Sequence, residues 1–201
     1  PKMADEILKE TGETIELIRS KITKKTVTLT CKTNVTVEMH REIEKLSSEN
    51  VLGFIEGTDK KDEIVILTAH YDHIGIDLKN NEVYNGADDD GSGTVAIMEI
   101  AEAFAKAKAE GKGPRRSVLI MPVAGEEKGL LGSEYYSENP VYPLANTVVD
   151  LNIDMIGRLD EKHADDPNYV YIIGSTMLSK ELHEVNEAAN FAGKARMRIA
   201  E

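Results

Sequence analysis

The sequence predicts an α/β fold in which helices cover both faces of a central sheet. Short apolar runs such as Ile64–Leu67 and Ser117–Ala124 are typical of strands that are buried on both faces. A helical pattern, Ser92–Ala109, lies between them, with apolar residues every three or four positions. Sheets built from alternating strands and helices bind their ligands beyond the carboxyl ends of the strands.

Composition narrows the classes of partner and of metal site. The chain has 201 residues, of which 41% are hydrophobic and 30% are charged, which suits one folded domain with a smaller appendage. A net charge of -12 argues against nucleic acid or an anionic membrane as the main partner. No apolar run approaches the roughly 18 residues of a spanning helix. Because Cys31 is the single cysteine, a transition metal would need histidine and carboxylate ligands.

The first part of the chain predicts one interrupted helix and two strands. Ala4–Ile22 has an amphipathic helical pattern that is broken at Thr11–Gly12. Val27–Cys31 and Val35–Met39 alternate between polar and apolar residues, as half-buried strands do, and we expect Cys31 to be half-buried there.

The second part predicts the sheet itself. Val51–Ile55 and Ile64–Leu67 are expected to form a hairpin through Gly57–Asp62, which has turn chemistry. The helix Ser92–Ala109 carries so wide an apolar stripe that we expect burial on most sides. The other expected elements are strands at Ser117–Ala124, Val148–Met155 and Tyr169–Ile173, and helices at Leu130–Glu138 and Ser179–Ala192.

Ionisable side chains recur where the expected strands end and where the long helix begins. They are His70, Asp72, His73, Asp88, Asp89, Asp90, Glu126, Glu127 and Asp154. If these clusters converge on one edge of the sheet, the carboxylates repel one another unless cations lie among them. The sequence therefore predicts a cation site at this edge.

Each cluster also has a structural interpretation. A lone histidine at a strand end is usually a polar turn residue, but Asp72 lies two positions after His70 and could fix the tautomer of a metal-binding imidazole. His73 lacks such a companion, and we interpret it as a pocket or surface residue. Glu126 and Glu127 resemble a solvated turn, yet they follow a buried strand directly, so that one can serve a metal and the other the substrate.

The aspartate run has three further interpretations. Asp88–Asp90 could cap the helix that follows. A calcium loop with Gly91 at its sixth position would put Gly86 first and Ile97 twelfth, where acidic ligands are required, so this interpretation fails. Gly91–Ala96 matches a degenerate dinucleotide motif, but three preceding aspartates would repel a pyrophosphate.

Four segments together resemble the co-catalytic zinc aminopeptidase family, which includes bacterial leucyl aminopeptidases and aminopeptidase Y, with glutamate carboxypeptidase and glutaminyl cyclase as relatives. These segments are Ala69–His73, Asn85–Gly93, Gly125–Ser133 and Asn152–Gly157. The resemblance runs from about Asn50 to Gly174. It implies a mixed, largely parallel sheet of the zinc exopeptidase, phosphorylase/hydrolase-like type, incomplete at the C-terminus. In that family, the peptide bond that corresponds to Asp89–Asp90 is typically cis.

The resemblance also implies a role for each site residue. His70 would bind one zinc ion, oriented by Asp72, and Asp154 would bind the same ion. Asp89 would bridge two zinc ions, and Glu127 would bind the second. A complete site of this kind contains two zinc ions.

Glu126 would then be the general base that acts on the attacking water, with peptides as substrates. The leading prediction is a metal-dependent aminopeptidase. A carboxypeptidase would need basic residues for the substrate carboxylate, and Arg158 is the one candidate near the site. A glutaminyl cyclase would use one zinc ion, and a non-catalytic peptide-binding domain would have no use for Glu126.

The resemblance is partial at both ends. Residues 1–45 resemble the tail of a protease-associated domain or a connecting segment, and residues 46–201 the first part of the peptidase domain. The family's fifth ligand is a histidine in a later segment; neither His163 nor His183 matches it, so we expect the 201-residue chain alone to be inactive. The family also implies secretion or a periplasmic location, although no signal peptide occurs in the sequence. The oligomeric state is left open.

Overall fold

The computed structural model describes residues 2–22, 26, 28–32, 34, 36–165, 167–193 and 198–200, with no account of the side chains of 178 and 198–200. The chain divides into two compact units, residues 1–46 and residues 47–201, and each is described by itself. The assignment of the first unit to a protease-associated domain stays a prediction.

The first unit begins with the interrupted helix that the sequence predicts. Its elements are α1 (Lys2–Leu8), the 3-10 turn η1 (Lys9–Thr11) and α2 (Ile15–Lys21). Gly12 has a positive φ of 70° and ends the first stretch. The side chain of Thr14 accepts a hydrogen bond from the backbone N–H of Leu17 and caps the second. The predicted break is therefore confirmed.

The two strands predicted next are wrong for the residues that the structure describes. Positions 28–31 and 36–39 form no strand, while Val27 and Val35 lie outside the described residues. Val37 and Met39 are 75% and 85% exposed, so no partner covers the apolar side of the alternating pattern. Cys31 is half-buried, as expected, but it does not lie in a strand.

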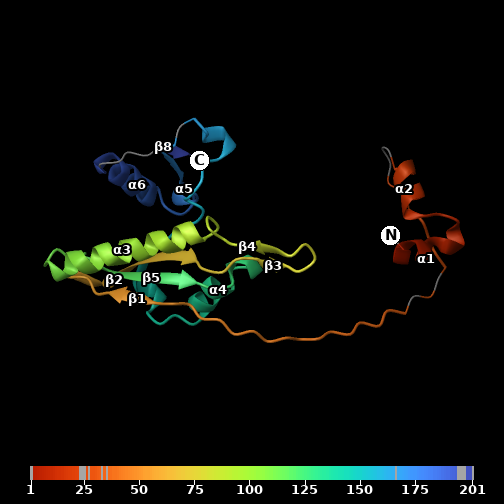
Figure 1. The fold of residues 1–201 in the computed structure, drawn as a ribbon, viewed down its shortest axis with the longest axis horizontal. Helices are drawn as coiled ribbons and strands as arrows, with labels where there is room; N and C mark the ends of the chain where they lie inside the picture. Colours follow the sequence, from red (N-terminus) through yellow and green to blue (C-terminus); the bar gives the residue numbers. More distant parts are fainter. Residues whose placement is uncertain are drawn as a thin grey trace. The chain divides into compact units, whose positions relative to one another are not determined.

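The second unit contains the mixed, largely parallel sheet that the sequence predicts. Its strands lie in the order β1 (Gly53–Ile55), β5 (Arg116–Val123), β2 (Lys60–His70) and β6 (Thr147–Asn152) (Figure 1). β2 runs parallel to β5 and β6, and β1 runs antiparallel to β5. The carboxyl ends of β2, β5 and β6 therefore meet at one edge.

Helices pack on both faces of this sheet, as predicted. The side chains of β2 and β5 alternate between the faces. One apolar cluster consists of Ile64, Ile66, Leu119, Met121, Val123 and, from α4 (Leu131–Glu138), Tyr136. The other consists of Leu67, Ala69, Val118, Ile120 and, from α3 (Gly91–Ala109), Ile97. The long helix is buried on its sheet side alone, since Val95 and Met98 are 57% and 60% exposed, so the expectation of burial on most sides was wrong.

The predicted hairpin between the first two strands of the sheet does not form. β5 lies between β1 and β2, and the connecting segment crosses the start of β5. The backbone N–H of Gly57 donates to Ser117 Oγ at 3.0 Å, and this hydroxyl donates to the carbonyl of Lys61 at 2.6 Å. A Cβ on Gly57 would lie 2.5 Å from the carbonyl oxygen of Arg115. Pairing with a strand distant in sequence therefore overrides the local turn signal.

Shorter elements complete the second unit. The antiparallel pair β3 (Gly75–Asp77) and β4 (Glu82–Tyr84) was not predicted. The others are the 3-10 turns η2 (Glu126–Lys128), η3 (Leu144–Asn146) and η4 (Glu161–His163), the parallel pair β7 (Tyr169–Tyr171) and β8 (Arg198–Ala200), and the helices α5 (Ser175–Leu178) and α6 (Lys180–Ala192). Among the described residues, no helix has the length and apolar character that crossing a bilayer requires.

The Ser117 hydroxyl gives a test of this topology. Ser117 is fully buried, and Ser117→Ala leaves the Gly57 N–H and the Lys61 carbonyl without this partner. We expect the free energy of unfolding to fall by about 1–3 kcal/mol, measured by urea denaturation. Thr58→Ala is the control, because Thr58 is exposed and its bonds are long. Equal stability of the two variants would contradict the crossing arrangement.

Candidate metal centre

The predicted clusters meet at the carboxyl edge of the sheet. His70 ends β2, Glu126 and Glu127 lie in η2 directly after β5, and Asp154 follows β6. The segment 88–90 leads into α3 at the same edge, and its Asp89–Asp90 peptide bond is cis, as the resemblance implies. Parallel strand direction therefore gathers residues that are more than 80 positions apart in sequence.

The ligand-type side chains form two adjacent groups. One contains His70, Asp90 and Asp154, and the other contains His73, Asp89 and Glu127; within each group, one ligand atom per residue lies within 4.8 Å of the others. Asp89 Oδ1 lies 3.0 Å from His70 Nε2, so Asp89 contacts both groups. One imidazole with two carboxylates is a donor set that zinc accepts, and the residues therefore fit the predicted metal.

His70 is held by a backbone group instead of the carboxylate that the sequence suggested. Its ring is 2% exposed, and Nδ1 lies 2.9 Å from the main-chain oxygen of Asp72 but 3.7 Å from the Asp72 carboxylate. A carbonyl oxygen accepts hydrogen bonds and does not donate them, so Nδ1 carries the proton. Nε2 is then left with its lone pair toward Asp89.

The Asp72 carboxylate has a different partner. Its two oxygens accept hydrogen bonds from the backbone N–H groups of Glu126 and Glu127, at 3.1 and 3.3 Å. Asp72 therefore fixes the turn that presents both glutamates. No local sequence signal indicates this contact, because it joins residues 54 and 55 positions apart.

Asp90 connects three segments of the centre. It is 1% exposed, and it accepts hydrogen bonds from the backbone N–H groups of His70, Gly93 and Met155 at 3.2, 2.9 and 3.2 Å. Burial raises the pKa of Asp90, and the bonds from Gly93 and Met155 oppose that shift. Because its oxygens accept hydrogen bonds from these amides, Asp90 connects the backbone segments around the centre. Asp89 is the carboxylate that faces both ligand groups.

The pKa values of Asp154 and His70 are both raised, in part because several carboxylates lie close together. Burial raises the pKa of Asp154, the charge of Asp89 raises it further, and His70 opposes the shift. Burial lowers the pKa of His70, but the bond to the Asp72 carbonyl and the nearby carboxylates outweigh this effect and leave the pKa raised. A divalent cation would relieve this repulsion.

The two adjacent glutamates face different partners, as predicted. Glu127 belongs to the second ligand group, and its Oε1 lies 2.7 Å from His73 Nδ1. Glu126 belongs to neither group; its Oε2 lies 3.8 Å from His70 Nε2, and its side chain is 31% exposed. Glu126 is therefore beside the ligands and open to solvent.

The other histidines of this unit lie in neither group. His163 Nδ1 lies 2.7 Å from Asp160 Oδ1, and its ring stacks on Tyr169. His183 Nδ1 lies 3.2 Å from Ser175 Oγ. His73 lines the cavity beside the centre, in agreement with its interpretation as a pocket residue. Its place in the second ligand group was not predicted, because a strand-end pattern does not show where the turn after the strand directs its next side chain.

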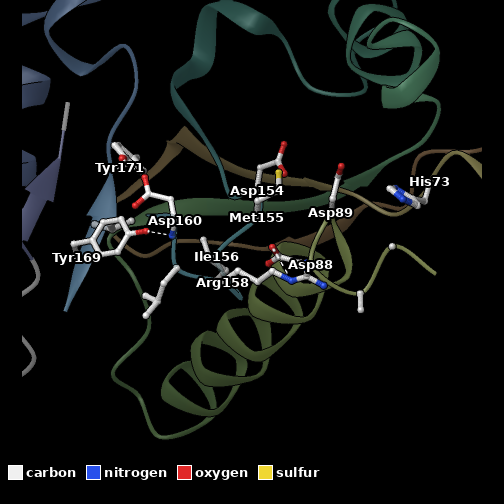
Figure 2. Close-up of a pocket in the computed structure, with 14 residues that line it drawn as sticks. His73, Asp88, Asp89, Asp154, Met155, Ile156, Arg158, Asp160, Tyr169 and Tyr171 are labelled. Carbon is white, nitrogen blue, oxygen red and sulfur yellow. Dashed lines mark hydrogen bonds and ion pairs between the residues drawn. The ribbon is translucent and has the colours of Figure 1, made fainter. Parts of the chain in front are cut away.

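A cavity of about 840 Å³ opens beside the centre (Figure 2). Its lining runs from His73, Gly86, Ala87, Asp88, Asp89 and Asp154 through Met155, Ile156, Arg158 and Leu159 to Asp160, Tyr169, Val170 and Tyr171. The hydroxyl of Tyr171 and the side chain of His163 lower the pKa of Asp160 to about 2. Asp160 therefore stays ionised, and the cavity wall is predominantly acidic.

The fold and the site together resemble those of metal-dependent hydrolases. Paired metal groups at the carboxyl edge of an α/β sheet, with a free carboxylate beside them and an open cavity in front, suit hydrolysis by an activated water.

Comparison with known proteins places the chain in a family. Residues 50–196 match Peptidase family M28, and the chain belongs to this family. It is 33% identical over 132 residues to "Probable zinc metalloprotease" of Pyrenophora teres f. teres (strain 0-1), covering 61% of this chain and 26% of that protein. It is 38% identical over 107 residues to "Probable glutamate carboxypeptidase LAMP1" of Arabidopsis thaliana, covering 53% of this chain and 14% of that protein. It is 33% identical over 123 residues to "Aminopeptidase NAALADL1" of Mus musculus, covering 60% of this chain and 15% of that protein.

These comparisons confirm the predicted metallopeptidase family, and zinc, the predicted metal, appears in the name of the fungal relative. The narrower resemblance to bacterial leucyl aminopeptidases stays a prediction. The chain spans about a quarter or less of the length of these relatives.

Metal removal gives a test of the centre. Zinc that binds the folded state alone should stabilise the chelator-treated protein by about 2.7 kcal/mol when its concentration is 100 times Kd, measured as a shift of Tm. In His70→Ala, one group loses its imidazole and the shift should fall. His183→Ala is the control, since His183 lies in neither group. An equal shift in wild type and His70→Ala would contradict the assignment of His70 as a ligand.

Proposed function

We propose that the whole protein is a zinc-dependent aminopeptidase that removes N-terminal residues from peptides. The observation that carries this proposal is the acidic cavity in front of the metal centre. Four carboxylates, those of Asp88, Asp89, Asp154 and Asp160, line it, and Arg158 is its one lysine or arginine among the described residues. A cavity with this charge attracts a protonated α-amino group and repels a terminal carboxylate.

Arg158 does little to reverse this charge. Its Nε lies 3.8 Å from Asp88 Oδ2, and its side chain is 79% exposed. Asp88 itself is anchored, because its Oδ1 accepts a hydrogen bond of 2.7 Å from the backbone N–H of Gly157. The cation therefore faces a fixed negative partner, and the remaining acids set the sign of the cavity.

Each site residue has a distinct task in this proposal. Zinc, when bound, polarises the scissile carbonyl and lowers the pKa of water. His70, Asp89, Glu127 and Asp154 hold the metal. Glu126, which lies outside both ligand groups, takes a proton from the attacking water and returns it to the leaving amine.

A carboxypeptidase is the second candidate. It is favoured by the position of Arg158 on the cavity wall, where the guanidinium could meet a substrate carboxylate. The plant relative carries the name of a glutamate carboxypeptidase. One arginine that already faces Asp88 is weak support for carboxylate binding.

Blocked peptides separate the two candidates. We expect the whole protein, loaded with zinc, to cleave a peptide with a free amino terminus, to leave its N-acetylated form intact and to tolerate C-terminal amidation. Product analysis by mass spectrometry identifies which end is shortened. Cleavage that survives acetylation but stops on amidation would establish the carboxypeptidase instead.

Glu126→Gln tests the general base. The amide cannot take up the proton, so kcat should fall by about 10²-fold or more while the zinc content stays at the wild-type value. Zinc content is measured by elemental analysis beside the kinetics. Loss of zinc in parallel with activity would make Glu126 a ligand.

Asp72→Asn tests the positioning of the glutamate turn. The amide can still accept one bond, but it cannot accept from both Glu126 and Glu127 with the strength of a charged group. We expect a fall of about 10- to 100-fold in kcat with little change in KM, because the turn loses its fixed position. A change in KM alone would place Asp72 on the substrate side.

A further inference from the structure

The least expected member of the centre is His73. The resemblance assigns it no role, since the family takes its fifth ligand from a later segment. Yet its Nδ1 lies 2.7 Å from Glu127 Oε1, and His73 forms a ligand-type group with Glu127 and Asp89. Figure 2 shows His73 next to Asp89 at one end of the cavity.

The contact between His73 and Glu127 lacks the geometry of a hydrogen bond. His73 Nδ1 and Glu127 Oε1 are both buried from solvent, and neither has a hydrogen-bond partner among the described residues. Two buried polar atoms at this distance, with no N–H directed between them, are unfavourable by themselves. They become favourable when a cation accepts the lone pairs of both.

The backbone also holds the His73 ring in this place. Gly86 has a positive φ of 61°, and a Cβ there would lie 2.9 Å from both Cβ and Cγ of His73. The same loop is closed onto the start of α3, since the Gly91 N–H donates to the Gly86 carbonyl at 2.8 Å. The loop that carries Asp89 therefore packs directly against the ring.

We propose that His73 is a ligand of the second zinc ion, which it binds through Nδ1 together with Asp89 and Glu127. This chain then supplies one imidazole and two carboxylates to each zinc ion: His70, Asp89 and Asp154 to one, and His73, Asp89 and Glu127 to the other. The proposal rests on zinc as the resident metal. It does not depend on which end of the peptide is cleaved.

Nuclear magnetic resonance of the wild-type chain tests this assignment directly. The chain has five histidines, which can be labelled with nitrogen-15 in the ring and loaded with two equivalents of cadmium-113 in place of zinc. We expect nitrogen–cadmium coupling at two imidazoles, through Nε2 of His70 and through Nδ1 of His73. His73→Gln should lose the second coupling and keep the first. Coupling at His70 without coupling at His73, or binding of a single ion, overturns the proposal.

Zinc affinity gives the second measurement. In competition with a chelator, His73→Gln should weaken one of the two zinc sites by more than about tenfold and leave the other within about twofold. His163→Gln is the matched control, because it removes a part-buried imidazole that lies in neither group. Unchanged affinity in His73→Gln overturns the proposal. So does a weakened site without coupling in wild type, which would make His73 a positioning residue for Glu127.

Discussion

The buried carboxylate of Asp90 is the interaction on which the arrangement of the metal centre depends. It accepts one backbone hydrogen bond each from the end of β2, the first turn of α3 and the segment after β6. Hydrogen bonds to a charged group contribute about 1.5–3 kcal/mol each, which offsets part of the cost of burying the carboxylate. This one side chain therefore joins the three segments that carry His70, Asp89 and Asp154.

The acids around this anchor divide into two kinds. Asp72, Asp88 and Asp90 accept bonds from backbone amides, which satisfy their charge within the protein. The acids in the two ligand groups outside this framework have no comparable set of amide donors among the described contacts. They face imidazoles and one another, so a bound cation would balance their charge. One set of carboxylates therefore holds the backbone of the site in place, and the other set is available to bind a metal ion.

The sequence was sufficient for the features that depend on long apolar runs. Ile64–Leu67 and Ser117–Ala124 are buried at all but one position each, so the parallel sheet and the edge where its strands end could be predicted. The clustering of His70, Asp89, Glu127 and Asp154 at that edge followed. Features that depend on which strands pair with each other could not be predicted from the sequence. The turn chemistry of Gly57–Asp62 suggested a hairpin, but β5 competes for the same strand edges. The Asp72 contact and the position of His73 depend on side-chain directions in a turn, which residue spacing does not encode.

The contacts made by residues 70–73 limit where residues can be inserted into or deleted from the chain. Its main-chain oxygen at Asp72 holds His70, the Asp72 carboxylate holds η2, and His73 reaches Glu127. Inserting or deleting a single residue here would shift all three contacts together, so this segment has a fixed length. The β3–β4 hairpin follows directly, and its tip at residues 78–81 is exposed. Insertions that are forbidden at 70–73 are therefore tolerated within about ten positions, where the chain leaves the centre and enters solvent.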